Sequence, residues 1–317
     1  MALWSPVQQK ISCVYIVSVQ QEPSTKRINQ PYSVIALDKL NHAAEMAGVE
    51  RARCTEKVDG TCCLVALDKG RPELWARLDR KLNKQAEKRF RKFQLGSKPS
   101  TAFECDVDRD FRVVPDCWKP ANGVQFVNGQ LQPDENGHIL GWVPVCSSAR
   151  QYVWHNMAVA REIGKALVLR PEAGRLILSA EPLTQLLDQT LELIGTHVNN
   201  NPYGLGRPEQ PLHVLVPHCA FGVTSPPQLS LSQLRSWFET PEGQVEGLVW
   251  CCANGELFKV NRHHVGLSWP LNTARLAEQP VLISVSFPTT DFVPNSIFAG
   301  LARLDKQTLP SIHHIRW

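Results

Sequence analysis

Residues 53–81 read RCTEKVDGTCCLVALDKGRPELWARLDRK, and this stretch decides the fold class. Its apolar runs are interrupted by Asp59-Gly60 and by a second turn at Asp68–Arg71. Short runs bounded by turn residues predict a strand, a tight turn, a second strand, another turn and a third strand. Lys57 therefore falls at the end of the first strand, directly before a turn.

The rest of the chain predicts further short strands and a few helices. Strands are expected over residues 12–19, 190–195, 213–218 and 281–287, with a hairpin joining 246–252 to 256–261 across Asn254-Gly255. Helices are expected over residues 38–48, 82–93, 182–189 and 230–238, the last capped by Ser230. Residues 95–150 predict irregular loops with short strands, and a polar tail is expected after the last strand. Many hairpins with few helices imply an α+β domain built on antiparallel sheets.

Composition narrows the class of protein. The chain has 317 residues, of which 43% are hydrophobic and 20% charged, so it can bury a sizeable core. A net charge of +4 is compatible with a polyanionic partner. Ten cysteines without a CxxC pair do not fit a structural zinc site. No GxGxxG or GxxxxGK[ST] follows a strand, which argues against Rossmann and P-loop nucleotide binding.

The sequence also carries no sign of export or membrane insertion. The first ten residues, MALWSPVQQK, lack a basic segment followed by an apolar one, so no signal peptide is expected. No apolar run is long enough to cross a bilayer. We therefore expect an intracellular protein, cytoplasmic or nuclear, with free thiols.

The segment TEKVDG (55–60) carries the chemistry. A free lysine is protonated at neutral pH and becomes a nucleophile only where desolvation or neighbouring cations lower its pKa. Taken alone, Lys57 could equally be a surface lysine before an Asp-Gly turn. Further motifs downstream, in a fixed order, favour the functional interpretation.

KxDG resembles the nucleophile motif of ATP-dependent ligases and messenger RNA capping enzymes, and TEKVDG is similar to the form found in RNA ligases. Four later stretches resemble the second to fifth motifs of that superfamily: LWARLDRK (74–81), LELIGT with NNPYG (191–204), VEGLVW (245–250) and LFKVNRHH (257–264). The runs TEKVDGTCC, LWARLDRK, TLELIG and NPYGLG are most similar to the vertebrate 5′-to-3′ RNA ligase family. The resemblance implies a covalent nucleotidyltransferase domain of the ligase and capping-enzyme type, ATP-grasp-like, with antiparallel sheets flanked by helices.

The resemblance assigns roles around the first motif. Lys57 is expected to attack the α-phosphorus of ATP and form lysyl-AMP. Glu56 would accept a hydrogen bond from the adenine edge. Asp59 would orient the loop, and Gly60 would let the backbone pass closely under the nucleotide.

The later motifs add five residues. Glu192 is expected to hold the ribose hydroxyls, and Glu246 to hold Mg²⁺ or Mn²⁺. Arg77 and Lys259 would neutralise charge on the phosphates. Phe221 is expected either to stack on adenine or to be a core aromatic, and the sequence does not choose between the two.

Two features have open interpretations. The basic helix offers Lys81, Lys84, Lys88, Arg89, Arg91 and Lys92, either as a solvated face or as a contact to the RNA backbone. In the fifth motif a second cation is expected two residues after Lys259, but Asn261 stands there, so that charge is either missing or supplied by Arg262. The pairs Trp154-His155 and His263-His264 are interpreted as structural.

About fifty residues follow the fifth motif, which is short for the OB-fold domain that DNA ligases and capping enzymes add there. We therefore expect an adenylyltransferase domain over residues 1–270 with a loop-rich insertion near 95–150, a small extension over 271–317, and no complete OB-fold.

The sequence thus predicts a monomeric, ATP-dependent RNA ligase that joins 5′-phosphate and 3′-hydroxyl RNA ends. The alternatives are an RNA guanylyltransferase and an inactive ligase-like RNA-binding protein.

Overall fold

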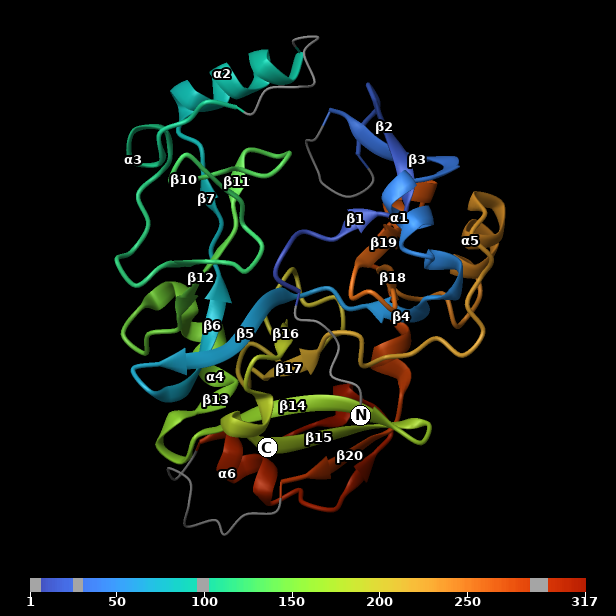
Figure 1. The fold of residues 1–317 in the computed structure, drawn as a ribbon. Coiled ribbons are helices and arrows are strands. Elements are labelled where there is room, and N and C mark those ends of the chain that lie inside the picture. The colour runs from blue at the N-terminus through green and yellow to red at the C-terminus, as the bar shows by residue number, and fades with distance from the viewer. Residues whose placement is uncertain (1–6, 25–30, 96–102, 286–295) are drawn as a thin grey trace.

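The computed structural model describes residues 7–24, 31–95, 103–285 and 296–317, and Figure 1 shows their arrangement. A large eleven-stranded sheet runs in the order β21-β20-β15-β14-β17-β16-β5-β6-β12-β8, with β13 paired to β14. Its strands are β5 (Thr61–Asp68), β6 (Arg71–Arg77), β8 (Lys119–Pro120), β12 (Gly141–Pro144), β13 (Val159–Ala160), β14 (Lys165–Glu172), β15 (Arg175–Pro182), β16 (Thr190–Gly195), β17 (His213–Pro217), β20 (Val281–Ser284) and β21 (Thr308–Leu309). Most neighbouring pairs are antiparallel, which confirms the predicted α+β class.

A second sheet has four strands in the order β1-β19-β18-β4. These strands are β1 (Ser12–Cys13), β4 (Arg53–Lys57), β18 (Gly247–Cys251) and β19 (Leu257–Asn261). β18 and β19 form the predicted hairpin across Asn254-Gly255. Beside them, β2 (Tyr15–Gln20) pairs with β3 (Ser33–Leu40). Across the described ranges both main sheets end in open edges, and no barrel closes among them.

The three strands predicted over residues 53–81 are present, but they are divided between the sheets. β4 pairs with β18 in the small sheet, whereas β5 pairs with β6 and β16 in the large one. Asp59 and Gly60 therefore connect two sheets rather than closing a two-residue hairpin. This connection places Lys57 where the two sheets meet.

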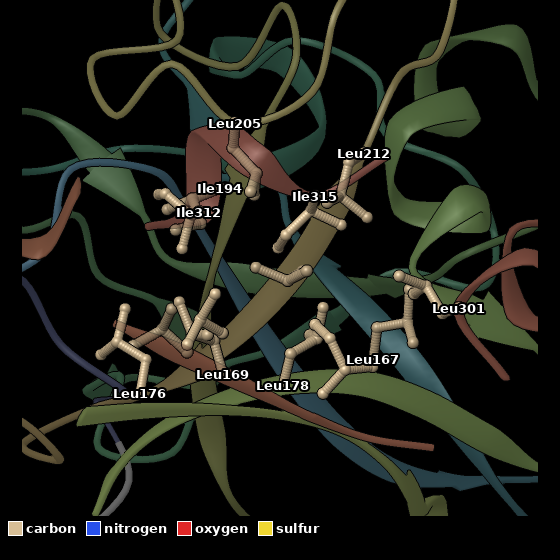
Figure 2. Close-up of a cluster of buried hydrophobic side chains, with 14 of the residues drawn as sticks. Leu167, Leu169, Leu176, Leu178, Ile194, Leu205, Leu212, Leu301, Ile312 and Ile315 are labelled. Carbon is tan, nitrogen blue, oxygen red and sulfur yellow. The ribbon is translucent and has the colours of Figure 1, made fainter. Parts of the chain in front are cut away.

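The largest core cluster packs against β14, β15 and β17 and includes residues from near the C-terminus (Figure 2). Leu167, Leu178 and Leu212 are fully buried there, together with Ile312. The expected polar tail is therefore wrong. Helix α6 (Ile297–Ala302) buries five consecutive residues, and its Gly300 is packed against Trp317. The predicted strand over 281–287 is β20, and its last two predicted residues lie outside the described ranges.

The small sheet is covered by helix α5 (Leu231–Phe238), whose Leu234, Trp237 and Phe238 are buried against Leu248 and Trp250. Ser230 is its N-cap as predicted, its side chain accepting a hydrogen bond from the Gln233 N–H.

Two predicted helices are shorter than expected. In residues 38–48, β3 continues to Leu40 and helix α1 covers only His42–Met46, because Asn41 is the N-cap, its Oδ1 accepting from the Ala43 N–H at 3.0 Å. In residues 182–189 only a single 3₁₀ turn forms, Leu183–Leu186, which buries both end leucines.

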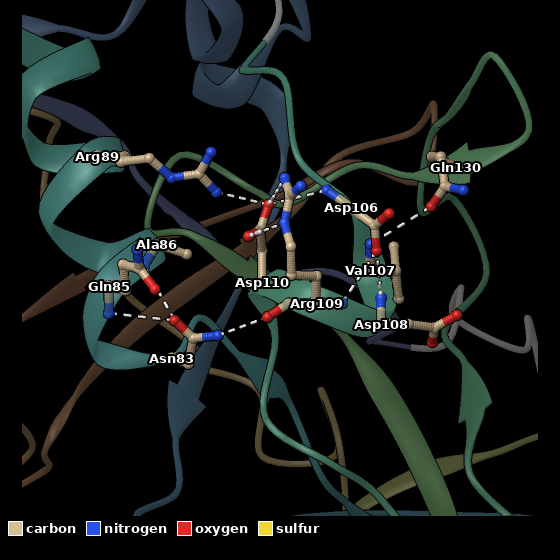
Figure 3. A network of polar contacts seen from close by, with 10 residues as sticks. All are labelled: Asn83, Gln85, Ala86, Arg89, Asp106, Val107, Asp108, Arg109, Asp110 and Gln130. Atoms are coloured by element: carbon tan, nitrogen blue, oxygen red, sulfur yellow. Dashed lines mark hydrogen bonds and ion pairs between the residues drawn. The ribbon is translucent and has the colours of Figure 1, made fainter.

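Residues 103–150 form loops with short strands, as predicted for this stretch, and the basic helix predicted before them is α2 (Lys84–Leu95). The other elements of this part are β7 (Arg80–Lys81), α3 (Val107–Asp110), β9 (Phe126–Val127), β10 (Gln130–Leu131) and β11 (His138–Ile139), with α4 (Val153–Met157) following β12. Figure 3 shows how buried Asp110 ties α2 to α3 through ion pairs with Arg89 at 2.6 Å and Arg109 at 3.2 Å. Arg89 is therefore engaged within the insertion, whereas Lys84 and Lys88 on α2 are exposed.

In the part of the chain that the structure describes, no helix is both long enough and apolar enough to cross a membrane.

Candidate active site

Lys57 lies at the end of β4 and contacts the carboxylate of Glu246. Strand pairing sets Lys57 opposite Gly247 and Gly247 opposite Asn261, so the three Cα atoms form one row across the small sheet. The Lys57 Nζ is 2.6 Å from Glu246 Oε2, and Asn261 Nδ2 donates to Glu246 Oε1 at 3.3 Å. Two residues that are 189 positions apart in the chain are thus held as a partly buried ion pair.

The electrostatics of this pair keep the lysine protonated. Burial alone would lower the pKa of Lys57, but the charges of Glu246 and Glu192 and the hydrogen bond to Glu246 outweigh it and raise the pKa above its ordinary value. The arrangement therefore favours the ammonium form of Lys57.

The loop after Lys57 is held by three side chains. Asn199 Nδ2 donates to Asp59 Oδ1 at 2.8 Å and to the Gly60 carbonyl at 2.7 Å. Trp269 Nε1 donates to Asp59 Oδ2 at 2.7 Å, and the Asp59 N–H donates to the Tyr203 hydroxyl at 2.7 Å. Asp59 thus anchors the loop through both carboxylate oxygens and its own N–H.

Gly60 is required by close packing. A Cβ built at this position would lie 2.2 Å from the Leu193 carbonyl oxygen and 2.8 Å from Glu192 Cγ. The backbone of the loop therefore lies directly against β16.

A cleft opens between the two sheets beside Lys57. Its empty volume, including the open mouth, is about 620 Å³. Glu56, Lys57, Phe221, Glu192 and His218 are among the residues that line it. Glu192 Oε2 lies 2.9 Å from His218 Nε2, so its carboxylate is oriented along the wall of the cleft.

Glu56 is a buried carboxylic acid within this cleft. Glu56 is only 4% exposed, and neither of its carboxylate oxygens has a hydrogen-bond partner among the described residues. Burial raises the pKa of Glu56 to about 7, while the positive charge of Arg275 acts in the opposite direction. An unsatisfied buried acid at a cleft wall points to a ligand that supplies the missing hydrogen bonds.

Because the folded-state pKa of Glu56 is raised, folding favours its neutral form. Relative to Glu56→Gln, the free energy of unfolding of the wild-type chain should fall as pH rises from about 4.5 to about 7. Above pH 7 this relative loss should reach about 3 kcal/mol. Urea unfolding of both chains across this pH range measures it. The exposed Glu50→Gln is the matched control and should follow wild type. If the difference in free energy of unfolding between wild type and Glu56→Gln stayed constant with pH, it would contradict the raised pKa of Glu56.

Phe221 is a core aromatic, one of the two roles that the sequence left open, and its stacking on adenine stays a prediction. It is 5% exposed and belongs to the largest core cluster, yet it also lines the cleft. Its carbonyl oxygen accepts from the Glu56 N–H at 2.8 Å, which fixes the loop to β4.

Arg77 and Lys259 do not line this cleft. Arg77 Nε bonds Asp79 at 2.6 Å, its Nη1 donates to the Gln8 carbonyl at 2.8 Å, and its guanidinium lies over the Trp142 ring. Lys259 is on β19 with its Cα opposite Cys13 and Val249. Both are thus placed beside the cleft rather than in its wall.

Arg262 does not supply the second cation expected in the fifth motif. It is 5% exposed and donates to the carbonyls of Phe238, Gly243 and Ser268, so it stabilises local backbone and does not replace the missing charge. Asn261 instead orients Glu246.

Several site residues were not predicted as such. Asn199 and Tyr203 hold the loop and lie in or beside the NNPYG stretch, so that motif carried a usable signal. Trp269 and His218 lie outside the quoted motifs and have no comparable signal. Cys62 lies in the quoted run TEKVDGTCC, but nothing in that run marks it as a site residue.

The donor chemistry of the site fits a hard divalent cation. Glu246 offers a buried carboxylate whose charge is balanced by the Lys57 ammonium, and Mg²⁺ and Mn²⁺ prefer such oxygen ligands.

Comparison with known proteins decides the family. A family model described as RNA ligase 1 matches residues 1–317. The chain belongs to the RNA ligase 1 family. RNA ligase 1 of Rattus norvegicus is 49% identical over 315 residues, covering 98% of this chain and 97% of the rat protein. RNA ligase 1 of Mus musculus is 49% identical over 317 residues, and that of Danio rerio is 46% identical over 317 residues, covering 98% of both chains. The resemblance to RNA ligases inferred from TEKVDG and the later motifs is confirmed.

Proposed function

We propose that this chain is an ATP-dependent RNA ligase that works through lysyl-AMP. The observation that carries the mechanism is the Lys57–Glu246 pair at the edge of the cleft between the sheets. The deprotonated Nζ of Lys57 would bond to the α-phosphorus of ATP, and the bond to the pyrophosphate oxygen would break. AMP would then pass to an RNA 5′-phosphate, and a 3′-hydroxyl would attack that end and release AMP.

The walls of the cleft suit a bound adenylate. Glu56 offers two unsatisfied oxygens to the adenine edge, and the Phe221 ring offers an apolar face to the base. Glu192, which also lines the cleft, would bond the ribose hydroxyls. Gly60 lets the backbone pass without a side chain, and Arg77 and Lys259 would approach the phosphates from beside the cleft.

Glu246 is proposed to hold Mg²⁺ or Mn²⁺. When bound, such an ion stabilises negative charge on phosphate oxygens. Glu246 can hold either the Lys57 ammonium or a metal cation, so it is the residue that links the protonation of Lys57 to metal binding. The chain is further proposed to be an intracellular monomer, with the domain over 1–270 and the extension over 271–317.

The test is direct labelling. The wild-type chain with α-labelled ATP and Mg²⁺ should gain a covalent label that survives denaturing electrophoresis and alkali but is released by acid, as a lysine phosphoramidate is, and addition of RNA with a 5′-phosphate should move the label to the RNA. Splinted RNA ends should then be joined. Labelling by α-labelled GTP in place of ATP would indicate guanylyltransfer, and RNA binding without any label would indicate an inactive relative.

A further inference from the structure

One wall of the cleft carries a second set of possible metal ligands, separate from Glu246. Cys62 on β5 is paired with Glu192 on β16, and His218 directly follows the neighbouring strand β17. One donor atom from each of the three residues lies within 4.8 Å of the other two. All three side chains line the cleft, so a cation held by them would remain accessible from its mouth.

The donor set differs in kind from an oxygen-only site. A thiolate, an imidazole and a carboxylate match the preferences of Zn²⁺ rather than those of Mg²⁺. Three protein ligands with a free fourth position are the arrangement of accessible zinc sites. Cys62 and Glu192 are fixed by adjacent strands of the large sheet, so little reorganisation is needed to bring the donors to one ion.

We propose that Cys62, Glu192 and His218 bind a thiophilic divalent cation of the Zn²⁺ class, and that this cation and adenylate exclude one another. On binding, a metal–sulfur bond forms and the Cys62 thiol releases its proton to solvent. Competition follows because Glu192 cannot coordinate a metal and bond the ribose at once, a step that rests on the proposed function. The site is thus inhibitory and distinct from the cation of Glu246.

The binding itself is tested without any catalytic readout. The full chain titrated with Co²⁺ should develop a thiolate-to-metal charge-transfer band. Cys62→Ser should lose this band, and His218→Gln should weaken Co²⁺ binding by about tenfold or more. Cys146→Ser, which changes an exposed thiol away from the cleft, is the matched control and should keep the band. Thermal melts of each variant establish that it is folded. An unchanged band in folded Cys62→Ser would overturn the site.

Competition is tested separately. Added ATP should reduce the Co²⁺ band of wild type, and Zn²⁺ should suppress labelling by α-labelled ATP reversibly with a chelator. For each variant, labelling with Zn²⁺ is compared with its own labelling without Zn²⁺. The half-inhibiting Zn²⁺ concentration should rise about tenfold or more in Cys62→Ser. A Co²⁺ band that ATP leaves intact would overturn the competition. A chain that binds Co²⁺ at Cys62 but gains no label would refute the proposed function and leave the metal site standing.

Discussion

Lys57→Ala will gain no covalent label from α-labelled ATP, a loss of about 10³-fold or more relative to wild type, because no other amine replaces a removed nucleophile. Lys57→Arg should fail equally. Arginine keeps the positive charge beside Glu246, but its guanidinium stays protonated and cannot attack phosphorus. Autoradiography of denaturing gels measures both.

The two variants separate chemistry from folding. Lys57→Ala leaves the Glu246 carboxylate buried without its cation, which costs about 3 kcal/mol of stability, whereas Lys57→Arg should stay closer to wild type. Lys39→Ala removes an exposed lysine of β3 and should label normally. Labelled Lys57→Ala, or loss of label in Lys39→Ala, would refute the assignment of the nucleophile.

Gly60→Ala will lower the free energy of unfolding by about 3 kcal/mol and strongly reduce labelling. The added methyl group meets the Leu193 carbonyl and the stem of Glu192, both on β16, so the loop must move away from the sheet and carry Lys57 with it. Urea unfolding and the labelling assay report the two effects.

Gly70→Ala is the matched control. Gly70 lies in the turn between β5 and β6 at a φ of +81°, and no heavy atom of another part of the chain stands within 4 Å of the place that an alanine methyl group would occupy. Gly70→Ala should lower the free energy of unfolding only by the backbone strain, about 1 kcal/mol, and labelling should be unaffected. Equal losses in the two variants would show that backbone conformation, rather than the contact with β16, is what Gly60 provides.

Local patterns predicted the strands well, because alternation and turn residues act within a few positions. The hairpin across Asn254-Gly255 and the Ser230 cap are of this kind. The division of β4 and β5 between two sheets could not be predicted locally, since it depends on Asn199 and Trp269 holding the Asp59–Gly60 loop.

The candidate site residues were predicted from motifs that follow one another in a fixed order, not from the spacing of individual residues. Glu246 was named, but its contact with Lys57 follows from the pairing of β4 with β18, which the sequence does not encode locally. The run Asn199–Asn201 did contain a signal, because all three residues adopt positive φ and asparagine tolerates that conformation better than most residues. Cys62 and His218 come together only when β5, β16 and β17 pair in the large sheet.

The parallel pairing of β20 with β15 has a consequence for synthesis of the chain. About a hundred residues separate the end of β15 from the start of β20. At ribosomal speeds of about 5 to 20 residues per second, the edge of β15 that pairs with β20 stays unpaired for roughly 5 to 20 s after β15 is made. The core beneath β15 also stays incomplete until Ile312 and Ile315 have been made. The nascent chain therefore presents an unpaired strand edge and an uncovered apolar surface, the features that holding chaperones bind, until residues 281–315 have been translated.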